Sequence, residues 1–236
     1  MMKDIWIKVR RDEFKFNILD GDICHTDAGW DFWTGDFPGV FEPATINWMR
    51  EYLDKDHDFL DIGAWVGPTA VYATKLARHV YAFEPDKVAF TYLIMNLANN
   101  AQNATAYNEA IATVSEVQMY SRTYPGDSMS NMLGAGIPTD TVKGCSLEAA
   151  INMGNPSLIK MDVEGGEALI LPANKELLRE RKIPLILSFH NQFYTNPDDF
   201  SNIVDAISVY DKFYDVNGNS IGVSQIPPGF DVILCL

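Results

Sequence analysis

Short apolar runs separated by helix-forming stretches recur along this sequence, and they constrain the fold more than any other feature. The runs lie at 59–62, 80–83, 104–107, 158–163, 185–189, 213–216 and 231–236. Strands that alternate with helices form β-α-β units, which build a mostly parallel sheet with helices on both faces. Helices are predicted at 69–77, directly after Pro68, and at 86–100, where apolar residues recur three and four apart. The sequence therefore predicts a doubly wound, seven-stranded α/β sheet.

The end of the chain predicts a change of strand direction. Turn-forming residues at 217–220 and 227–229 separate the last two apolar runs. Two strands joined in this way suit an antiparallel pair that closes the sheet. We expect the last strand to be antiparallel to its neighbours, which is unusual for a dinucleotide-binding dehydrogenase.

Two segments fall outside the alternating pattern. Residues 1–45 are predicted to form an N-terminal arm, and residues 46–236 form the main domain. The connection between the third and fourth predicted strands is longer than one crossover helix requires. We therefore expect an inserted β-rich loop at 115–145, with strands at 117–122 and 139–143. This loop is either a lid or a flexible surface connection.

Charge and composition narrow the class of partner. The 32 acidic residues against 18 Lys and Arg give a formal net charge of −14, which repels phosphate backbones and anionic lipid headgroups. The three cysteines are too few for a disulfide framework or a zinc site. No stretch is apolar enough for a membrane helix or a signal peptide. We expect a cytoplasmic protein whose partner is neither nucleic acid nor a membrane.

The clearest motif is a buried strand that enters a glycine turn at 59–67. Its spacing, Asp61-x-Gly63-x-x-x-Gly67, lacks the three-glycine pattern of a dinucleotide fold. Glycine permits a sharp turn, and the acid before it suits a cationic ligand group such as an ammonium. A purely structural turn is the alternative interpretation of this motif alone.

The next two strands end in polar residues at the same expected edge. Glu84 lies 17 residues beyond Gly67, where an acid can accept both hydroxyl protons of a ribose. Asn108 and Glu109 follow the third strand and offer polar groups where an adenine edge would lie.

The candidate catalytic residues follow the fourth and fifth strands. Asp162 and Glu164 are two apart, so an extended backbone directs both to one side of the cleft. His190 ends the fifth apolar run and could accept a proton near neutral pH. Such a set indicates a base, a metal site or a substrate clamp. The alternatives are a helix-capping Glu164 and a structural histidine.

These motifs together resemble the FkbM family of S-adenosylmethionine-dependent methyltransferases. The resemblance rests on Asp61-Ile62-Gly63-Ala64, Phe83-Glu84-Pro85, Asn96 and Lys160-Met161-Asp162-Val163-Glu164-Gly165, and covers roughly residues 40–190. It implies a class I methyltransferase fold. It also implies that Asp61, Gly63, Ala64 and Gly67 line the methionine end of the cofactor, Glu84 its ribose, and Asn108 or Glu109 its adenine. Trp65-Val66 and the inserted loop depart from the family pattern.

The implied cofactor determines what the protein has to supply. Its methyl group sits on a sulfonium, so the protein must align the acceptor and exclude water. A hydroxyl acceptor, on a sugar or a small metabolite, must also lose its proton. We assign this step to Asp162, Glu164 and His190, either as a direct base or through a divalent metal such as Mg²⁺.

Other interpretations stay open at this stage. The aromatic residues Trp30, Phe32, Trp33 and Phe37 either cover the cleft or pack the arm on the core. The fold could serve as a catalytically inactive binding module or a subunit of a larger assembly. A nucleic-acid methyltransferase is the third possibility, although Asp162-Val163-Glu164-Gly165 stands where an amino-methylating enzyme carries Asn or Asp-Pro-Pro-Tyr.

Overall fold

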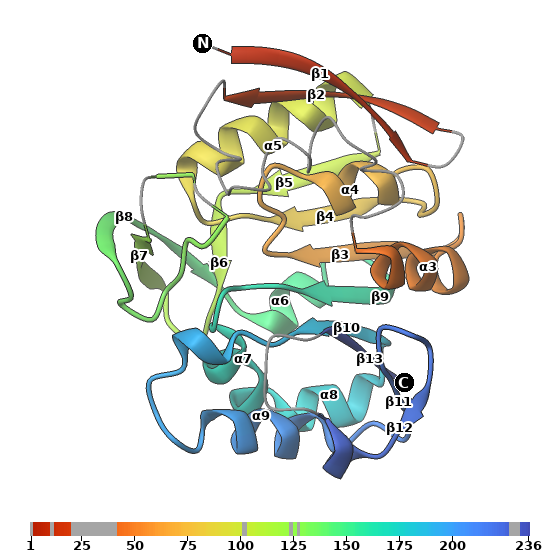
Figure 1. Ribbon diagram of the computed structural model, residues 1–236, viewed down its shortest axis with the longest axis vertical. Coiled ribbons are helices and arrows are strands. Elements are labelled where there is room, and N and C mark those ends of the chain that lie inside the picture. The colour runs from red at the N-terminus through yellow and green to blue at the C-terminus, as the bar shows by residue number, and fades with distance from the viewer. Residues whose placement is uncertain are drawn as a thin grey trace.

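A single large sheet organises the computed structural model (Figure 1). The structure describes residues 2–9, 12–19, 42–100, 103–122, 125–126, 128–226 and 232–236. The strand order is β12-β11-β13-β10-β9-β3-β4-β5. These strands are β3 (Asp58–Ile62), β4 (Val80–Phe83), β5 (Ala104–Tyr107), β9 (Pro156–Met161), β10 (Leu185–Ser188), β11 (Phe213–Tyr214), β12 (Ser220–Ile221) and β13 (Val232–Cys235). Order reverses between β3 and β9, the position where open α/β sheets bind ligands.

Helices cover both faces of this sheet, because successive residues of each strand point to opposite sides. One apolar cluster joins Phe59 to α3 (Pro43–Tyr52), α4 (Pro68–Ala73) and α5 (Lys87–Asn100). The opposite cluster joins Leu60 to the remaining helices, α6 (Leu147–Ile151), α7 (Glu167–Ala173), α8 (Lys175–Arg181) and α9 (Asp199–Ile207). The predicted doubly wound α/β class is therefore confirmed. In the described residues, no helix has the length and apolarity of a membrane span.

The carboxyl-terminal part confirms the antiparallel closure and corrects the strand count. β13 pairs antiparallel with both β10 and β11. The described sheet has eight strands, because β12 adds a short antiparallel edge beside β11. Asp215 stabilises the turn of this hairpin, since its Oδ1 accepts hydrogen bonds from the backbone N–H groups of Asn217 and Asn219.

The insertion forms a sheet of its own, with the order β6-β8-β7. Its antiparallel strands are β7 (Glu116–Ser121) and β8 (Ile137–Cys145), near the predicted positions. The third strand, β6 (Glu109–Ile111), was not predicted and pairs parallel with β8. The insertion therefore begins directly after β5, at the edge where the candidate site lies.

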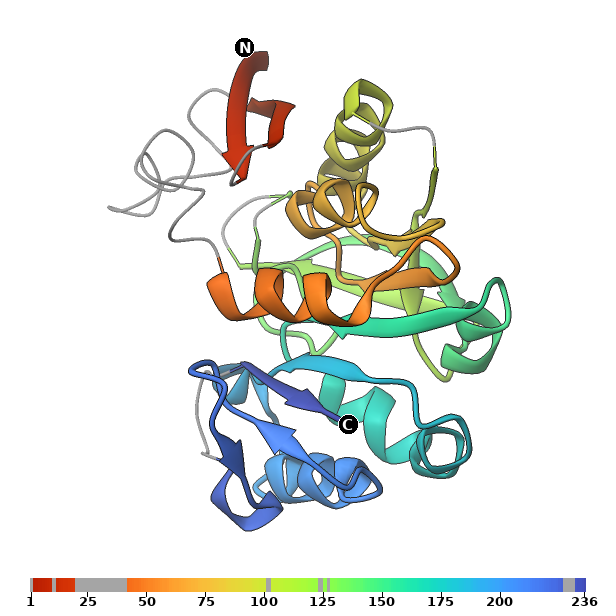
Figure 2. The same ribbon diagram turned by 90° about the vertical axis from the view of Figure 1, so that its right-hand side faces the viewer.

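At the other end of the chain, β1 (Met2–Val9) and β2 (Asp12–Leu19) form an antiparallel hairpin. Figure 2 shows this hairpin above the end of the sheet that carries α5. The Asn100 side chain fastens it to α5, through hydrogen bonds with the backbone N–H and carbonyl of Lys15 at 2.8 and 2.7 Å. The four arm aromatics lie outside the described residues, so their place over the cleft stays a prediction.

A buried lysine joins the two strands at the point where the sheet order reverses. Lys160 of β9 is the register partner of Asp61 of β3. Its Nζ lies 3.1 Å from Asp162 Oδ2 and 3.7 Å from Asp61 Oδ1. Burial alone would lower the pKa of the Lys160 ammonium, but the neighbouring carboxylates, Asp162 first, raise it above its ordinary value. The ammonium is therefore charged and fixes both strand ends.

We predict that Lys160→Met lowers the free energy of unfolding by about 3–5 kcal/mol, because it leaves buried carboxylates without their cation. Lys175→Met is the matched control, since Lys175 pairs at 2.7 Å with Asp205, whose side chain is 70% exposed. That variant should change stability by less than about 1 kcal/mol. Urea unfolding at pH 7 measures both. If both variants lowered the free energy of unfolding equally, Lys160 would contribute no more to stability than an exposed lysine.

Candidate functional site

The turn after β3 lies against the end of β9. Gly63 has φ +79°, and a Cβ on it would lie 1.8 Å from the Asp162 carbonyl oxygen. Only glycine fits at this position, for two reasons. Its positive φ is strained for other residues, and a side chain would collide with the backbone at the end of β9. Gly67, with φ +97°, precedes α4, and a Cβ there would meet Leu93 of α5 at 2.7 Å. Gly67 therefore permits close packing between the start of α4 and α5.

Asp61 is buried beneath this turn and contacts groups of the chain itself. Its Oδ2 accepts a hydrogen bond from Thr69 Oγ1 at 2.6 Å, and its Oδ1 faces Lys160. Burial raises the pKa of the Asp61 carboxyl, against the opposing effects of Lys160 and Thr69. Asp61 thus links β3 to the start of α4 and to β9.

Glu84 closes the other side of the turn. Its Oε2 accepts a hydrogen bond from the Trp65 backbone N–H at 2.8 Å, and its Oε1 accepts one from Asp86 N–H at 2.7 Å. Burial, reinforced by the Asp86 charge, raises the pKa of Glu84 to about 8. Trp65 itself has φ +49°, a left-handed conformation that this hydrogen bond supports.

Asn108 and Glu109 diverge after β5. The Asn108 side-chain amide donates to the carbonyl oxygens of Glu84 and Pro85, both at 2.9 Å. Glu109 is the first residue of β6, and its Oε1 lies 2.6 Å from Lys143 Nζ. Asn108 therefore lies beside Glu84, whereas the Glu109 carboxylate is held within the small sheet.

The insertion reaches across this edge from β4 to β9. Asp86 Oδ2 accepts hydrogen bonds from Gly126 N–H at 2.9 Å and from Ser130 Oγ at 2.8 Å. At the far end, a Cβ on Gly165 would lie 2.6 Å from Leu133 Cδ1. The inserted segment therefore contacts residues that follow both strands.

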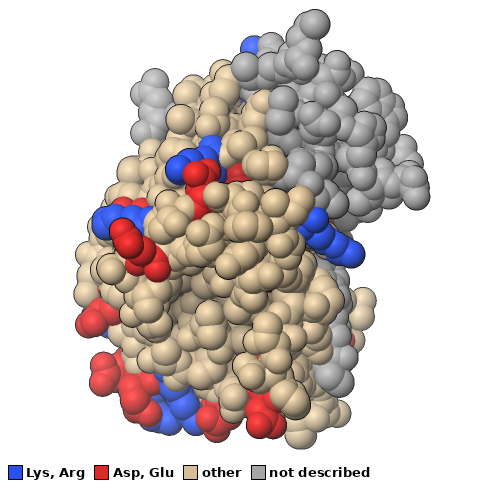
Figure 3. Space-filling model, turned by 90° about the vertical axis from the view of Figure 1, so that its left-hand side faces the viewer, with Lys and Arg blue, Asp and Glu red and all other residues tan. Residues whose placement is uncertain are grey.

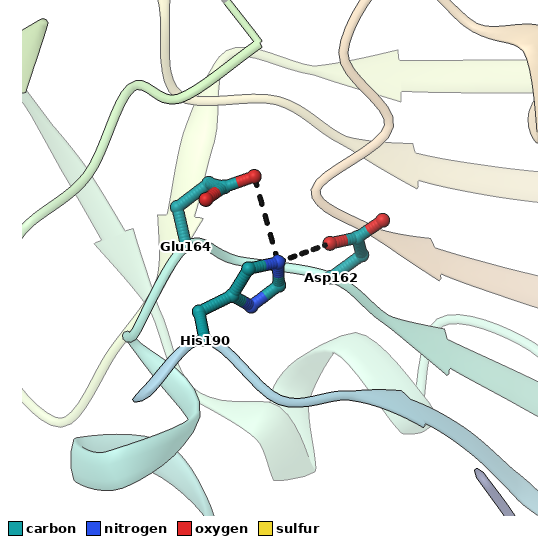
Figure 4. A group of neighbouring side chains, drawn as sticks. All are labelled: Asp162, Glu164 and His190. Atoms are coloured by element: carbon teal, nitrogen blue, oxygen red, sulfur yellow. Dashed lines mark ion pairs between the residues drawn. The ribbon is translucent and has the colours of Figure 1, made fainter. Parts of the chain in front are cut away.

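Three predicted catalytic residues converge beyond β9 and β10 (Figure 4). His190 Nε2 lies 3.2 Å from Asp162 Oδ1 and 3.5 Å from Glu164 Oε1. Glu164 has φ +49° and precedes Gly165 with φ +94°, and Figure 4 shows its side chain turned toward the imidazole. His190 is 1% exposed, while Asp162 and Glu164 are partly exposed, so the group has an open side.

Behind the imidazole lies Glu167, a buried carboxylate that the motif analysis missed. Its Oε1 accepts hydrogen bonds from His190 N–H at 2.8 Å and from the Tyr194 hydroxyl at 2.9 Å, and lies 3.3 Å from His190 Nδ1. Its Oε2 accepts a hydrogen bond from Gly165 N–H at 3.0 Å. Glu167 therefore holds the imidazole, the turn after β9 and Tyr194 together.

The charges in this group depend on one another. Burial alone would lower the pKa of the His190 imidazole, but hydrogen bonds to Asp162 and Glu167 raise it to about 11. Burial alone would raise the pKa of the Asp162 carboxyl, but Lys160 and then His190 hold it well below its usual range. The group thus stabilises positive charge at the position of the imidazole.

Among the predicted residues, two sets result. Asp61, Gly63 and Asp162 meet at the β3/β9 reversal, and Asp162, Glu164 and His190 form the convergent group. Glu109 lies apart with Lys143. Lys160 and Glu167 were not assigned roles, although an acid three residues after Glu164 was a signal that could have been followed.

Comparison with known proteins identifies the family. A model of the Methyltransferase FkbM domain matches residues 61–214, more than half of the 236 residues. No curated protein matches the sequence. A solved FkbM methyltransferase from Methylobacillus flagellatus KT is similar at 16% identity and a TM-score of 0.52, over 78% of this chain and 44% of that chain. This chain thus spans less than half the length of that protein.

Two other solved methyltransferases are similar at 13% identity. An rRNA methylase from Streptococcus thermophilus has a TM-score of 0.48, over 81% of this chain and 93% of that chain. A precorrin-6y C5,15-methyltransferase from Geobacter metallireducens GS-15 has a TM-score of 0.46, over 83% and 85%. The family model starts at Asp61 and extends past His190, so it includes every residue of the convergent group. The chain belongs to the FkbM methyltransferase domain family.

Proposed function

We propose that the protein transfers a methyl group from S-adenosylmethionine to a hydroxyl group of a sugar or another small metabolite. The observation that carries this proposal is the contact between the Gly63 turn and the Asp162 end of β9. It puts a cofactor-type turn directly beside a group that can accept a proton. Methyl transfer to a hydroxyl needs these two features next to each other.

In this proposal the first three strand tips bind the cofactor. The turn formed by Gly63, Ala64 and Gly67, with Asp61 beneath it, receives the cationic methionine end. Glu84 accepts the ribose hydroxyls, since each of its oxygens has a further lone pair after binding one backbone N–H. The Asn108 amide nitrogen is already bonded, which leaves its carbonyl oxygen to accept a hydrogen bond from adenine.

The convergent group then receives the acceptor. Methyl transfer forms a bond between the acceptor oxygen and the methyl carbon and breaks the bond between that carbon and sulfur. The hydroxyl proton must leave, and the Asp162 and Glu164 carboxylates beside the His190 imidazole offer adjacent groups that can accept it. The sulfonium cation becomes a neutral thioether, and the positive charge leaves with the hydroxyl proton, which the carboxylate takes up. Positioning and water exclusion supply the rest of the rate.

Surface charge supports a small acceptor over a nucleic acid. The formal net charge is −14. On the described part of the face in Figure 3, Lys and Arg lie singly or beside acidic residues. A nucleic-acid enzyme usually gathers its cations into a patch or stripe that follows the phosphates.

We predict that Glu84→Ala weakens S-adenosylmethionine binding by about 1.5–3 kcal/mol, the usual range for hydrogen bonds to a charged group. Glu176→Ala is the matched control, because the Glu176 side chain is 73% exposed and pairs with its helix neighbour Arg179. Isothermal titration calorimetry measures both. Normal binding by the Glu84 variant would remove this residue from the ribose site.

The pKa of Glu84, about 8, predicts a pH dependence of ribose binding. Ribose hydroxyls donate to the ionised carboxylate, so binding lowers this pKa and releases a proton below pH 8. The association constant should rise by at most about tenfold per pH unit up to about pH 8 and then level off. 5′-Methylthioadenosine is the probe from pH 6 to 9, because it has the ribose without the titrating ammonium. Glu84→Gln should give a flat profile; a flat wild-type profile would contradict the assignment.

We predict that His190→Ala lowers turnover by about 10²–10⁴-fold with cofactor affinity nearly unchanged, since a positioned acid–base group contributes this much. His57→Ala is the control, because the His57 side chain is 42% exposed and pairs with Asp54. The acceptor would first be found by screening sugars and small hydroxylated metabolites with labelled S-adenosylmethionine. Equal turnover in the two variants would exclude His190 from the reaction.

A further inference from the structure

We propose that Asp162, Glu164 and His190 bind one divalent metal ion. One ligand atom from each residue can be chosen so that all three lie within 4.8 Å of one another. His190 Nε2 lies 3.2 Å from one of these carboxylates and 3.5 Å from the other. The inference extends the proposed function, because it specifies how the convergent group acts on the acceptor.

The spacing fits a single ion. Metal bonds of about 2.0–2.2 Å put neighbouring ligand atoms about 3.0–3.5 Å apart in octahedral or tetrahedral geometry. The two distances from the imidazole nitrogen fall in that range. Three ligands on one side leave further coordination positions, and the partial exposure of both carboxylates provides a path to them.

The groups behind the ligands are arranged as in metal centres. A metal-bound histidine commonly donates its second ring N–H to a carboxylate, which fixes the ring and the tautomer. Glu167 Oε1 lies 3.3 Å from His190 Nδ1 and is itself fully buried, so Nε2 is the nitrogen that faces the ligands. Lys160 in turn contacts Asp162 Oδ2 at 3.1 Å, which leaves Oδ1 directed at the imidazole.

The local charge also favours a dication. Three carboxylates, those of Asp162, Glu164 and Glu167, lie around the imidazole, and the Lys160 ammonium contacts the first of them, Asp162. With the imidazole neutral, as in a metal ligand, the three carboxylates and the Lys160 ammonium sum to a formal charge of −2, and Asp61, the second partner of Lys160, adds a further negative charge when it is ionised. A divalent ion would offset this excess of negative charge, which is costly to leave in a largely buried site.

The donor set narrows the choice of ion. Calcium takes six to eight oxygen ligands, and Mg²⁺ also prefers oxygen, so a buried imidazole disfavours both. One nitrogen and two carboxylates suit first-row ions such as Mn²⁺, Fe²⁺ or Zn²⁺. A bound ion of this kind would supply a Lewis acid that makes an acceptor hydroxyl more acidic.

Mn²⁺ binding by the 236-residue chain, freed of metal with a chelator, tests the inference without any methyl transfer. We expect one ion per chain by calorimetry, and nitrogen coupling in the pulsed electron paramagnetic resonance spectrum that disappears in His190→Gln. Asp162→Asn and Glu164→Gln should each weaken binding by about tenfold or more, and Glu167→Gln by about 10–100-fold. Asp205→Asn is the control, because Asp205 is an exposed carboxylate paired with Lys175, and should bind as the wild type does.

Three results would overturn the metal site: no binding of Mn²⁺ or Zn²⁺ at millimolar concentration, binding that the ligand variants leave unchanged, or no nitrogen coupling. Circular dichroism and thermal unfolding establish that each variant is folded before it is titrated. The proposed function is judged separately by S-adenosylmethionine binding to the metal-free protein. Cofactor binding without metal binding would reject only the metal site, and metal binding without cofactor binding would reject only the methyltransferase proposal.

Discussion

The buried Lys160 ammonium is the contact on which the site geometry depends. It lies between a carboxylate of β3, Asp61, and one that follows β9, Asp162. Buried charges are tolerated only when they are paired closely, so strand ends that carry them have little freedom to shift relative to one another. The Gly63 turn rests on the Asp162 carbonyl in the same place. One ion-pair group therefore sets the distance between the cofactor turn and the convergent group.

The features that sequence analysis predicted well are those encoded by neighbouring residues. Apolar runs of four to six residues mark the parallel strands, and a polar residue near or just after the carboxyl end of each run marks its tip. Glu84, Asp162 and His190 were located in this way. Because the tips of parallel strands share one edge of the sheet, a strand-by-strand interpretation was enough to bring Asp162 and His190 together.

What sequence analysis missed depends on contacts between distant residues. Glu167 gains its role from His190 and Tyr194, which are 23 and 27 positions away. β6 exists because it pairs with β8, some thirty residues later, and no local pattern in its three residues predicts that pairing. The same pairing explains the position of the Glu109 side chain. Glu109 was grouped with Asn108 because the two residues are adjacent in the sequence. In the structure, strand alternation and the ion pair with Lys143 separate the two side chains.

The carboxylates at this edge of the sheet differ in how many hydrogen bonds they already accept from the chain. This number distinguishes carboxylates that stabilise the fold from those that can bind a ligand. Asp86 accepts hydrogen bonds from Gly126 and Ser130 through one oxygen and from Val88 and Ala89 N–H through the other. Such a group has little capacity left for a ligand. Asp162, in contrast, contacts a lysine and a histidine through separate oxygens on a partly exposed side. A cationic ligand can replace the imidazole proton as the partner of the Asp162 carboxylate, and this leaves the backbone in place. Replacing the backbone N–H donors of Asp86 would instead require the chain around that residue to move.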